Sequence, residues 1–365
     1  MSVKEQTPEQ VTVRSAWTRR NATGGNDRER SRLVAQRGYT KRSDVHSDCA
    51  LPQKAPKTKH PAAASRCQQD NTLREPKRLR RRVRLLKRAG LLGHTAKWAS
   101  ITRAISCEDL HQAYQLVHDV FVEKGYIEPQ SGALRVRSYE ASAEMATFVA
   151  KTEGRVVAVL SIVPDSDDLG LPSDRAFQEE LDELRLEGRK IAEITNNAVA
   201  PEYRKTPLFM ELIRACMAHA LSMGIDNVFV SSNPGHAGLF RGILQAEPWG
   251  RRRKYSQKDG DLVEGTCWDL SGLEERFKAA DSILGSLAFL HRSFYSENPY
   301  RRYVRPWTSM ARRSFVDSQL LRLLFVERTG LLDRLSDEER SVIRRRWGPE
   351  IFDAVVRGVP TAAFA

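Results

Sequence analysis

The chain has 365 residues, enough for one large domain or two modest ones, and a formal net charge of +13. Residues 1–92 hold 23 Lys and Arg against 8 Asp and Glu, a net charge of +15, which leaves −2 for the rest of the chain. The positive charge therefore belongs to the N-terminal stretch, so we do not expect the folded body to bind nucleic acid. The sequence has no run of 18 apolar residues, which excludes a membrane-spanning helix.

The cysteines, at positions 49, 67, 107, 216 and 267, show no CxxC spacing, so neither a metal site nor a redox dithiol is predicted. Scattered cysteines are typical of a reducing compartment. The N-terminus has no apolar segment of the kind found in secretory signals. Together these features predict a cytoplasmic protein.

Residues 1–75 are polar, basic and poor in large apolar side chains, which predicts a disordered tail. Residues 76–97 form the next segment, a basic amphipathic helix or linker in which Leu79, Val83 and Leu86 recur at helical spacing. Two interpretations of this helix stay open. It can dock on an anionic membrane surface, a nucleic acid or an acidic partner through residues 76–92, or it can pack on the main domain through its apolar stripe.

Residues 98–272 alternate between strand and helix patterns and are predicted to form one domain. A strand at 101–106 precedes a helix that Ser106 caps and Gly125 ends. A hairpin follows, with strands at 146–151 and 155–163 joined by Glu153-Gly154. Further helices are expected from Phe177 to Leu186 and at 234–245, and a final antiparallel pair at 249–256 and 262–270.

The stretch 191–234 reads as strand, loop, amphipathic helix and strand. Pro207 lies at the expected first helical position and Gly224 at the expected C-terminal cap. Such a βαβ unit normally has two parallel strands. Combined with the antiparallel hairpins, it predicts a mixed α/β sheet with helices on both faces.

Residues 273–365 are predicted to be a helical C-terminal extension. Residues 274–295 read as one amphipathic segment, and Ser336 with Glu339 forms a capping box that opens a helix ended by Gly348-Pro349.

Several motifs resemble those of the long-chain N-acyl amino acid synthases, the FeeM-like proteins of the GNAT superfamily, which are related to the acyl-homoserine-lactone synthases. They are VHDVFVEKGYIEP ending at Pro129, the DSxxxGLPxD pattern at 165–174, EELDELRLEGRKIAEITNNAV at 179–199, and NPxH at 233–236. The resemblance spans roughly residues 100–270. It implies a GNAT-like fold and transfer of a fatty acyl group from acyl carrier protein to the amine of an amino acid.

The resemblance also implies where the donor binds. GNAT proteins hold the donor's pyrophosphate with a glycine-containing loop after the central strand, and here that loop runs from Val199 through Arg204 and Lys205 to Leu208 and Phe209. Both glycines of the pattern are missing. A helix N-terminus still favours one phosphate, so we expect 4′-phosphopantetheine arriving on the carrier protein, and no separate cofactor.

Three residues are candidate catalytic groups: Glu193, Asn196 and His236. Glu193 lies in an otherwise apolar strand and is the predicted base that deprotonates the amine; the alternative is a structural ion pair with Arg189 or Arg204. Asn196 interrupts the strand, either as a bulge that turns a backbone amide toward the thioester carbonyl or as a plain bulge. His236 is a base or a substrate-binding group, or an exposed residue at a helix start.

The remaining candidates are predicted to bind the amino acid substrate: Asp165, Thr195, Asn197 and Asn233. Asp165, Asp167 and Asp168 can hold an α-ammonium or form a solvated turn. A basic surface of Arg251–Lys254, Arg292, Arg301 and Arg302 can steer an acidic carrier protein.

One departure from the GNAT pattern favours a different function. Many GNAT enzymes place a tyrosine that protonates the leaving thiolate where this chain has Phe240. The alternatives to an acyltransferase are therefore a degraded acyl-binding sensor, or a membrane- or nucleic-acid-docked protein that uses its basic tail.

Overall fold

The computed structural model describes residues 76–92, 98–255, 262–305 and 317–358. The disordered tail predicted for residues 1–75 lies outside these ranges. The predicted boundaries at residues 97/98 and 272/273 stay a prediction. In the described part of the chain, no helix is long and apolar enough to cross a membrane.

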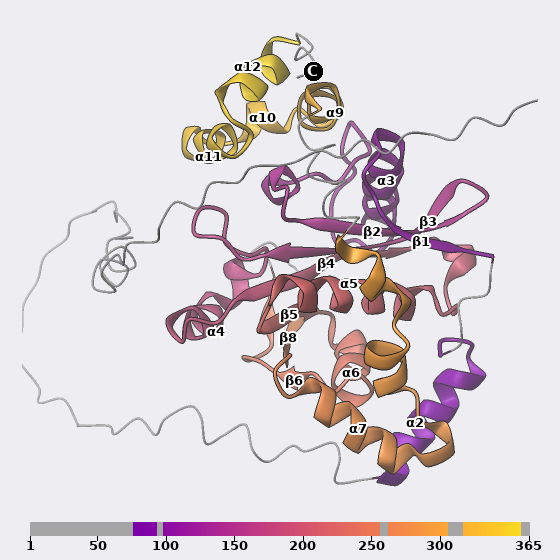
Figure 1. Cartoon of the computed structure of the whole chain (residues 1–365). Coiled ribbons are helices and arrows are strands. Elements are labelled where there is room, and N and C mark those ends of the chain that lie inside the picture. Colours follow the sequence, from indigo (N-terminus) through magenta and orange to yellow (C-terminus); the bar gives the residue numbers. More distant parts are fainter. Residues whose placement is uncertain (1–75, 93–97, 256–261, 306–316, 359–365) are drawn as a thin grey trace, which may run out of the picture. The chain divides into compact units, whose positions relative to one another are not determined.

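The centre of the fold is one mixed sheet with strand order β1-β2-β3-β4-β5-β8-β6 (Figure 1). Only β4 and β5 run parallel; the other neighbours are antiparallel, and β7 adds a short pairing with β8. The strands are β1 (Ser100–Arg103), β2 (Ala146–Thr152), β3 (Arg155–Pro164), β4 (Ile191–Val199), β5 (Asn227–Ser232), β6 (Glu247–Pro248), β7 (Arg253–Lys254) and β8 (Leu262–Asp269). This arrangement confirms the predicted mixed α/β sheet.

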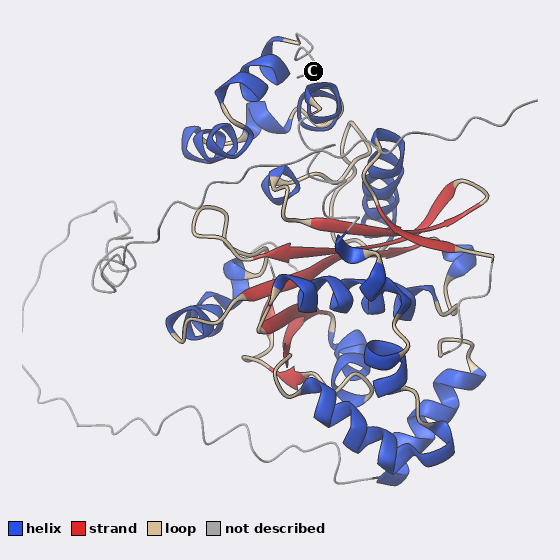
Figure 2. Cartoon of the chain, in the orientation of Figure 1, coloured by secondary structure: helices blue, strands red, loops and turns tan. Residues whose placement is uncertain are grey.

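Helices cover both faces of the sheet (Figure 2). The helices of the central region are α2 (Pro76–Arg88), α3 (Cys107–Glu123), α4 (Asp174–Leu186), α5 (Leu208–Met223), α6 (Pro234–Gly242) and α7 (Leu273–Leu284). Because side chains alternate along a strand, Val149 packs with α3 on one face while its neighbour Phe148 packs with α5 on the other. The face under α3 and α4 is called the α3/α4 face below, and the opposite one the α5 face.

Local sequence signals explain how these elements begin and end. Ser106 caps α3 by accepting a hydrogen bond from the Asp109 backbone N–H at 3.1 Å, as predicted. Glu153 and Gly154 both have positive φ, which gives the hairpin turn the type I′ geometry that suits the strand twist. Gly224 ends α5 in the left-handed conformation, whereas Pro207 immediately precedes the helix rather than being its first residue.

Two predicted elements differ from the structure. Residues 274–295 do not form one segment, because Gly285 adopts a positive φ of 59° and ends α7; a 3-10 turn at Gly285–Leu287 and a π-helical turn, η6 (Arg292–Ser296), follow. Within the strand predicted at 249–256 only the two-residue strand β7 forms; β6 lies just before this range, and Gly250 takes a positive φ between the two.

The C-terminal helices form their own apolar cluster. The helices are α9 (Ser318–Arg322), continued by a π-helical turn η8 (Leu323–Glu327), then α10 (Leu331–Arg334), α11 (Asp337–Trp347) and α12 (Pro349–Arg357). The capping box of Ser336 and Glu339 is confirmed, as is the helix end at Gly348-Pro349. This cluster includes Tyr114 of α3 and the segment around the 3-10 turn η3 (Ser138–Ala141).

The basic helix α2 packs on the α5 face through its apolar stripe. Leu79 and Val83 are buried in the main core, and Leu86 packs against it. The stripe that a membrane-surface helix would insert into lipid is thus covered by the domain. Packing on the domain through this stripe is therefore observed, and docking of an acidic partner by the basic residues of α2 stays a prediction.

Candidate functional site

The parallel strands β4 and β5 separate after a short common run. Only Ile191–Glu193 pair with Asn227–Phe229. Beyond that point β5 stays paired with β8 and β4 with β3, so the facing edges of the two strands have no ladder partner in the described residues. The hydroxyl oxygens of Ser231 and Ser232, at this end of β5, are buried and have no hydrogen-bond partner in the same ranges. Unpaired backbone and hydroxyl groups favour occupation of such an opening by a ligand.

A β-bulge lies on β4 beside this opening. Val159 pairs with Ala198 and Ser161 with Thr195, so the two residues Asn196 and Asn197 oppose Leu160 alone. Asn196 takes a positive φ of 52°, which asparagine tolerates better than most residues. The bulge expected at these asparagines is confirmed; a role for its backbone amide in catalysis stays a prediction.

The Asn196 side chain belongs to a buried hydrogen-bond network. Its Nδ2 donates to Glu140 Oε1 at 3.0 Å and to Ser161 Oγ at 3.3 Å, and its Oδ1 accepts from Arg137 Nη2 at 3.3 Å. Arg137 also forms an ion pair with Glu140 at 3.2 Å. Arg137 and Glu140 were not predicted as site residues. The alternation of charged and apolar residues at 134–137 indicates that Arg135 and Arg137 share one side of the segment, but it does not indicate what they contact.

Glu193 is a buried carboxyl group without an ion-pair partner in the described residues. It is 3% exposed and accepts hydrogen bonds from the Ser173 backbone N–H at 2.8 Å and the Ser173 hydroxyl at 2.7 Å. Burial raises its pKa to about 7, because the bonds from Ser173 and the charge of Arg137 offset only part of the desolvation. A carboxyl group with this pKa can accept a proton near neutral pH.

The ion pair of Glu193 with Arg189 or Arg204, offered as the alternative, is not formed. Arg189 bonds instead to Asn227 and Asp269, and Arg204 pairs with Glu123. Glu193 is hydrogen-bonded instead to Ser173, the residue directly before α4. Its carboxyl group therefore lies at the N-terminus of this helix.

The predicted donor loop joins β4 to α5. Arg204 is held by Glu123, with Nη1–Oε1 at 2.8 Å, and its Nε donates to the Val199 carbonyl at 3.3 Å. Lys205 is exposed and has a positive φ of 65°, a conformation usually taken by glycine. Leu208 is buried as the first residue of α5, and Phe209 is partly buried. The first backbone N–H groups of α5 therefore face the loop without intrahelical acceptors.

Comparison with known proteins identifies the central region. The family model described as N-acyl amino acid synthase FeeM matches residues 112–263. Residues 112–263 are therefore similar to this family of N-acyl amino acid synthases.

Solved structures of this fold class are also similar to the chain, whereas no curated protein matches it. The N-acyl amino acid synthase FeeM from uncultured soil microbes is 21% identical, with a TM-score of 0.43, over 48% of this chain and 93% of that one. The CoA-dependent acyl-homoserine lactone synthase BjaI is 19% identical, with a TM-score of 0.35, over 49% and 88%. An N-acetyltransferase from Staphylococcus aureus Mu50 is 17% identical, with a TM-score of 0.36, over 47% and 98%.

Two predicted substrate-binding groups of this region are engaged in structural contacts. Asp165 accepts two hydrogen bonds from Arg185, Nε–Oδ2 at 2.7 Å and Nη2–Oδ1 at 2.9 Å. Asn233 caps α6 by accepting a bond from the Gly235 backbone N–H at 3.1 Å. Asp168, beside Asp165, pairs with Arg346 of α11. The ammonium-binding role proposed for Asp165 therefore competes with a bidentate ion pair.

The other predicted residues lie at different depths. Thr195 is partly buried, whereas Asn197 and His236 are exposed. His236 makes its described bond through its backbone, to the Asn233 carbonyl at 2.8 Å, which agrees with the simpler interpretation of an exposed residue at a helix start. Phe240 is buried between Phe209 and Trp268, with ring centroids 6.1 and 5.6 Å away.

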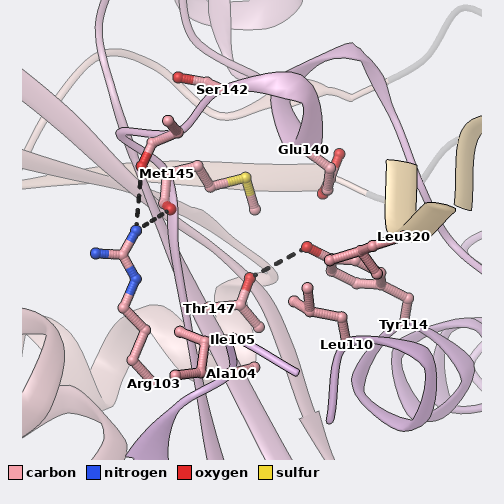
Figure 3. Close-up of a pocket in the computed structure, with 11 residues that line it drawn as sticks. Arg103, Ala104, Ile105, Leu110, Tyr114, Glu140, Ser142, Met145, Thr147 and Leu320 are labelled. Atoms are coloured by element: carbon pink, nitrogen blue, oxygen red, sulfur yellow. Dashed lines mark hydrogen bonds between the residues drawn. The ribbon is translucent and has the colours of Figure 1, made fainter. Parts of the chain in front are cut away.

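A small pocket on the α3/α4 face borders the buried network (Figure 3). Glu140 lines it, together with apolar side chains such as Leu110, Met145 and Leu320. Figure 3 shows the Tyr114 hydroxyl directed toward Thr147, 3.5 Å away, and the Thr147 hydroxyl lies 3.0 Å from that of Ser161.

A row of hydrogen bonds thus runs from the pocket to the site, because the Ser161 hydroxyl also accepts a bond from Asn196. Arg103 closes another wall of the pocket, donating to the Met145 carbonyl at 2.7 Å.

Proposed function

We propose that this chain is an N-acyl amino acid synthase that moves a long-chain fatty acyl group from an acyl carrier protein thioester to the amine of an amino acid. The observation that carries the proposal is the buried carboxyl of Glu193, which has no ion-pair partner in the described residues and lies where β4 and β5 separate, within the region that matches the FeeM model. A thioester is already activated, so the chemical need is a neutral amine beside it.

In the proposed reaction Glu193 takes one proton from the substrate's ammonium group and passes it to solvent. The neutral nitrogen attacks the thioester carbonyl carbon. The C–N bond forms and the C–S bond breaks. The second proton lost by the nitrogen goes to the departing thiolate, so the products are the amide, the carrier thiol and one proton. An α-amine has a pKa of roughly 8, close to that of Glu193, so the transfer costs little.

The donor is proposed to enter the opening between β4 and β5, with its phosphodiester near the first N–H groups of α5. Phosphopantetheine needs one phosphate site rather than the cradle for a pyrophosphate. This suits a loop in which Pro207 provides no N–H and Arg204 is occupied by Glu123. We therefore favour a carrier-bound donor over coenzyme A.

Helix α2 is proposed to help dock the acidic carrier protein. It carries eight Lys and Arg residues and no acidic residue. A Cβ on Gly90, just after α2, would lie 3.1 Å from the Lys205 carbonyl of the donor loop, so the helix end borders the donor's entry. The basic surface predicted elsewhere is partly neutralised, since Arg252 pairs with Glu264, Arg253 with Glu180 and Arg292 with Glu297.

The decisive experiment is mass spectrometry of lipid extracts from cells that express the chain, followed by an assay with purified protein and acyl carrier protein. We expect a new N-acyl amino acid that depends on the protein. Soluble, folded protein that yields no product with any of the common amino acids would refute the proposal.

A non-catalytic acyl-binding sensor is the second candidate, and Phe240 favours it. The residue is buried and has no hydroxyl to protonate a thiolate. Acyl carrier protein that binds without turnover would support this alternative. The cytoplasmic location predicted from the sequence stays a prediction.

A further inference from the structure

Two arginines outside the predicted site lie on one side of the segment that precedes η3. Leu134 and Val136 are 1% and 5% exposed and belong to the apolar cluster of the C-terminal helices. Arg135 and Arg137 alternate with them and are only partly buried. The alternation directs the two guanidinium groups away from the C-terminal cluster, and Arg137 reaches Asn196 on β4.

The C-terminal helices fix the backbone that carries these arginines. A side chain on Gly132 would collide with the Arg328 carbonyl, so the segment and the end of η8 are in direct contact. At its other end, the Trp347 indole N–H donates to the Ala141 carbonyl at 3.0 Å. Arg328 and Trp347, which make these two contacts, lie outside residues 112–263, the part matched by the family model.

Neither arginine has its donors satisfied within the described residues. Arg135 stacks over the Phe121 ring, 4.8 Å from its centroid, and forms no described ion pair; its Nε is buried without an acceptor. Arg137 uses Nη2 for Glu140 and Asn196, and its buried Nε also has no acceptor. Buried N–H groups without acceptors are rare in native proteins and mark places where a ligand or water completes the site.

The local charge balance favours an anion. Burial, and then the neighbouring charge of Arg137, lower the pKa of Arg135 to about 10, as expected for a cation without a compensating carboxylate. Exposed Arg175, near the start of α4, adds a third positive charge to this neighbourhood. Against these, Glu140 is paired with Arg137, and Glu193 has a pKa of about 7 and so is only partly ionised at neutral pH.

The arginines are linked to the proposed base through Tyr255. Its phenol lies within electrostatic range of Arg135, Arg137 and Glu193. The phenol donates to the Pro172 carbonyl at 3.2 Å, and Pro172 directly precedes Ser173, the hydrogen-bond partner of Glu193. Positive and negative groups therefore stand side by side on the α3/α4 face.

We infer that Arg135 and Arg137 bind the carboxylate of the acceptor, while Glu193 receives its ammonium group. An α-amino acid carries both charges on one carbon, and arginine is the side chain best suited to bind a carboxylate through paired hydrogen bonds. The inference rests on the proposed function and deepens it by naming the residues that bind the acceptor's carboxylate. An amine without a carboxylate beside it should therefore be a poor acceptor.

The phosphodiester of the donor is the other anion available, but its proposed seat is on the opposite side of the sheet. Helix α5 packs on the α5 face, whereas Arg137 approaches Asn196 together with Glu140 and η3 on the α3/α4 face. The two sources can be separated in kinetics, because loss of a donor contact raises the KM for the thioester and loss of an acceptor contact raises the KM for the amino acid.

The test compares wild type with Arg135→Gln, Arg135→Lys and the control Arg357→Gln, which removes an exposed arginine of α12. The acceptors are the best amino acid, its decarboxylated amine and its carboxamide. We expect wild type to prefer the amino acid. In Arg135→Gln its KM should rise about 10- to 100-fold, with the thioester KM unchanged, and Arg135→Lys should recover part of the loss.

Three results would overturn the inference while leaving the proposed function intact. They are equal use of amino acid and amine by wild type, an unchanged acceptor KM in Arg135→Gln, and a rise in the thioester KM instead. A chain that acylates no acceptor at all would refute the proposed function itself.

A binding experiment tests the arginines without turnover. N-dodecanoyl glycine has a free carboxylate that its methyl ester lacks. Because glycine has no side chain, neither compound needs a pocket for one. The acid should raise the melting temperature of wild type more than the ester does, and Arg135→Gln should abolish this difference. Equal shifts for acid and ester in wild type would refute carboxylate binding, even for an inactive protein.

Discussion

The two faces of the sheet bury different kinds of side chain around the point where β4 and β5 separate. On the α3/α4 face, Glu193, Glu140 and Asn196 are buried and joined to their neighbours by hydrogen bonds. On the α5 face, Phe240 and Trp268 pack ring against ring. A strand can supply both environments because alternate side chains point to opposite faces. A zwitterionic acceptor suits the polar face and an apolar acyl chain suits the apolar face. The opening between β4 and β5 connects the two faces, so the two substrates can react there.

The largest effect should come from removing the carboxylate on the polar face. Glu193→Gln keeps the volume and can still accept a hydrogen bond from Ser173, but it cannot take a proton. We expect kcat/KM to fall by roughly 10²- to 10⁴-fold. In wild type, kcat/KM should rise with pH up to about 7, as Glu193 ionises. In the variant, the residual kcat/KM should instead keep rising to about pH 8, following deprotonation of the free amine.

Glu211→Gln is the matched control, since Glu211 is also a buried carboxylate but lies on α5. It pairs with Arg214 at 2.6 Å and accepts a bond from the Tyr300 hydroxyl at 2.6 Å. This variant should lower the melting temperature and leave kcat near wild type. Equal losses of activity in both variants would mean that Glu193 acts only through stability.

The apolar face is tested by Phe240→Ala. Loss of a buried phenylalanine side chain should cost about 3–5 kcal/mol of unfolding free energy, since the cavity left beside Phe209 and Trp268 cannot close fully. Urea denaturation measures the loss. A cost below about 1 kcal/mol would show that the aromatic cluster is loosely packed.

Phe240→Tyr is the companion variant. It retains the ring and adds the hydroxyl that many GNAT enzymes have at this place. A gain in kcat would identify thiolate protonation as a limiting step, and an unchanged kcat would show that the thiolate leaves without help.

The β4 region illustrates what could be predicted from the sequence. A glutamate within an apolar strand needs either hydrogen-bond partners or a function, and two adjacent asparagines disfavour regular strand pairing. Both signals are local in the sequence. The structure accordingly has a buried carboxyl group at Glu193 and a bulge at Asn196 and Asn197. The partners of Glu193 were not predictable in the same way. Ser173 lies 20 residues earlier and reaches the carboxyl group only because α4 begins beside β4.

The arginine pair was hidden for a different reason. Leu134 and Val136 are apolar because they face the C-terminal helices, about 200 residues later in the chain, and no pattern within 134–137 indicates that partner. Conversely, Asp165 looked available for substrate because its acidic turn is local, whereas its ion pair with Arg185 depends on how α4 packs. Long-range packing thus decides which of these charges have ion-pair partners among the described residues.

The polar face should also make stability depend on pH. The folded-state pKa of Glu193 is about 7, above its usual 4.5, so folding favours the protonated form. This contribution is fully present below pH 4.5 and is lost as pH rises through 7. Its loss amounts to about 3 kcal/mol by pH 8. Urea denaturation from pH 5 to 8 should show a fall in stability that is absent in Glu193→Gln; parallel curves for both proteins would contradict the assignment.

The smallest expected effect concerns donor docking on the α5 face. Reversing three exposed charges of α2, Arg81→Glu, Arg84→Glu and Arg88→Glu, spares the buried Leu79 and Val83 and should leave the fold intact. Because these cations are proposed to steer an acidic carrier protein, KM for the carrier-bound acyl donor should rise about tenfold at low salt, and less at high salt.

A short acyl-pantetheine thioester provides the control for docking, because it needs the opening between β4 and β5 but no protein surface. Its KM should not change in the α2 variant. Equal increases for both donors would place the effect at the opening itself, whereas no increase for either would remove α2 from donor binding. With Arg135→Gln acting on the acceptor alone, the two sets of variants separate donor from acceptor across the same sheet. If either set of variants weakened binding of both the donor and the acceptor, the two substrates would not bind on opposite faces of the sheet.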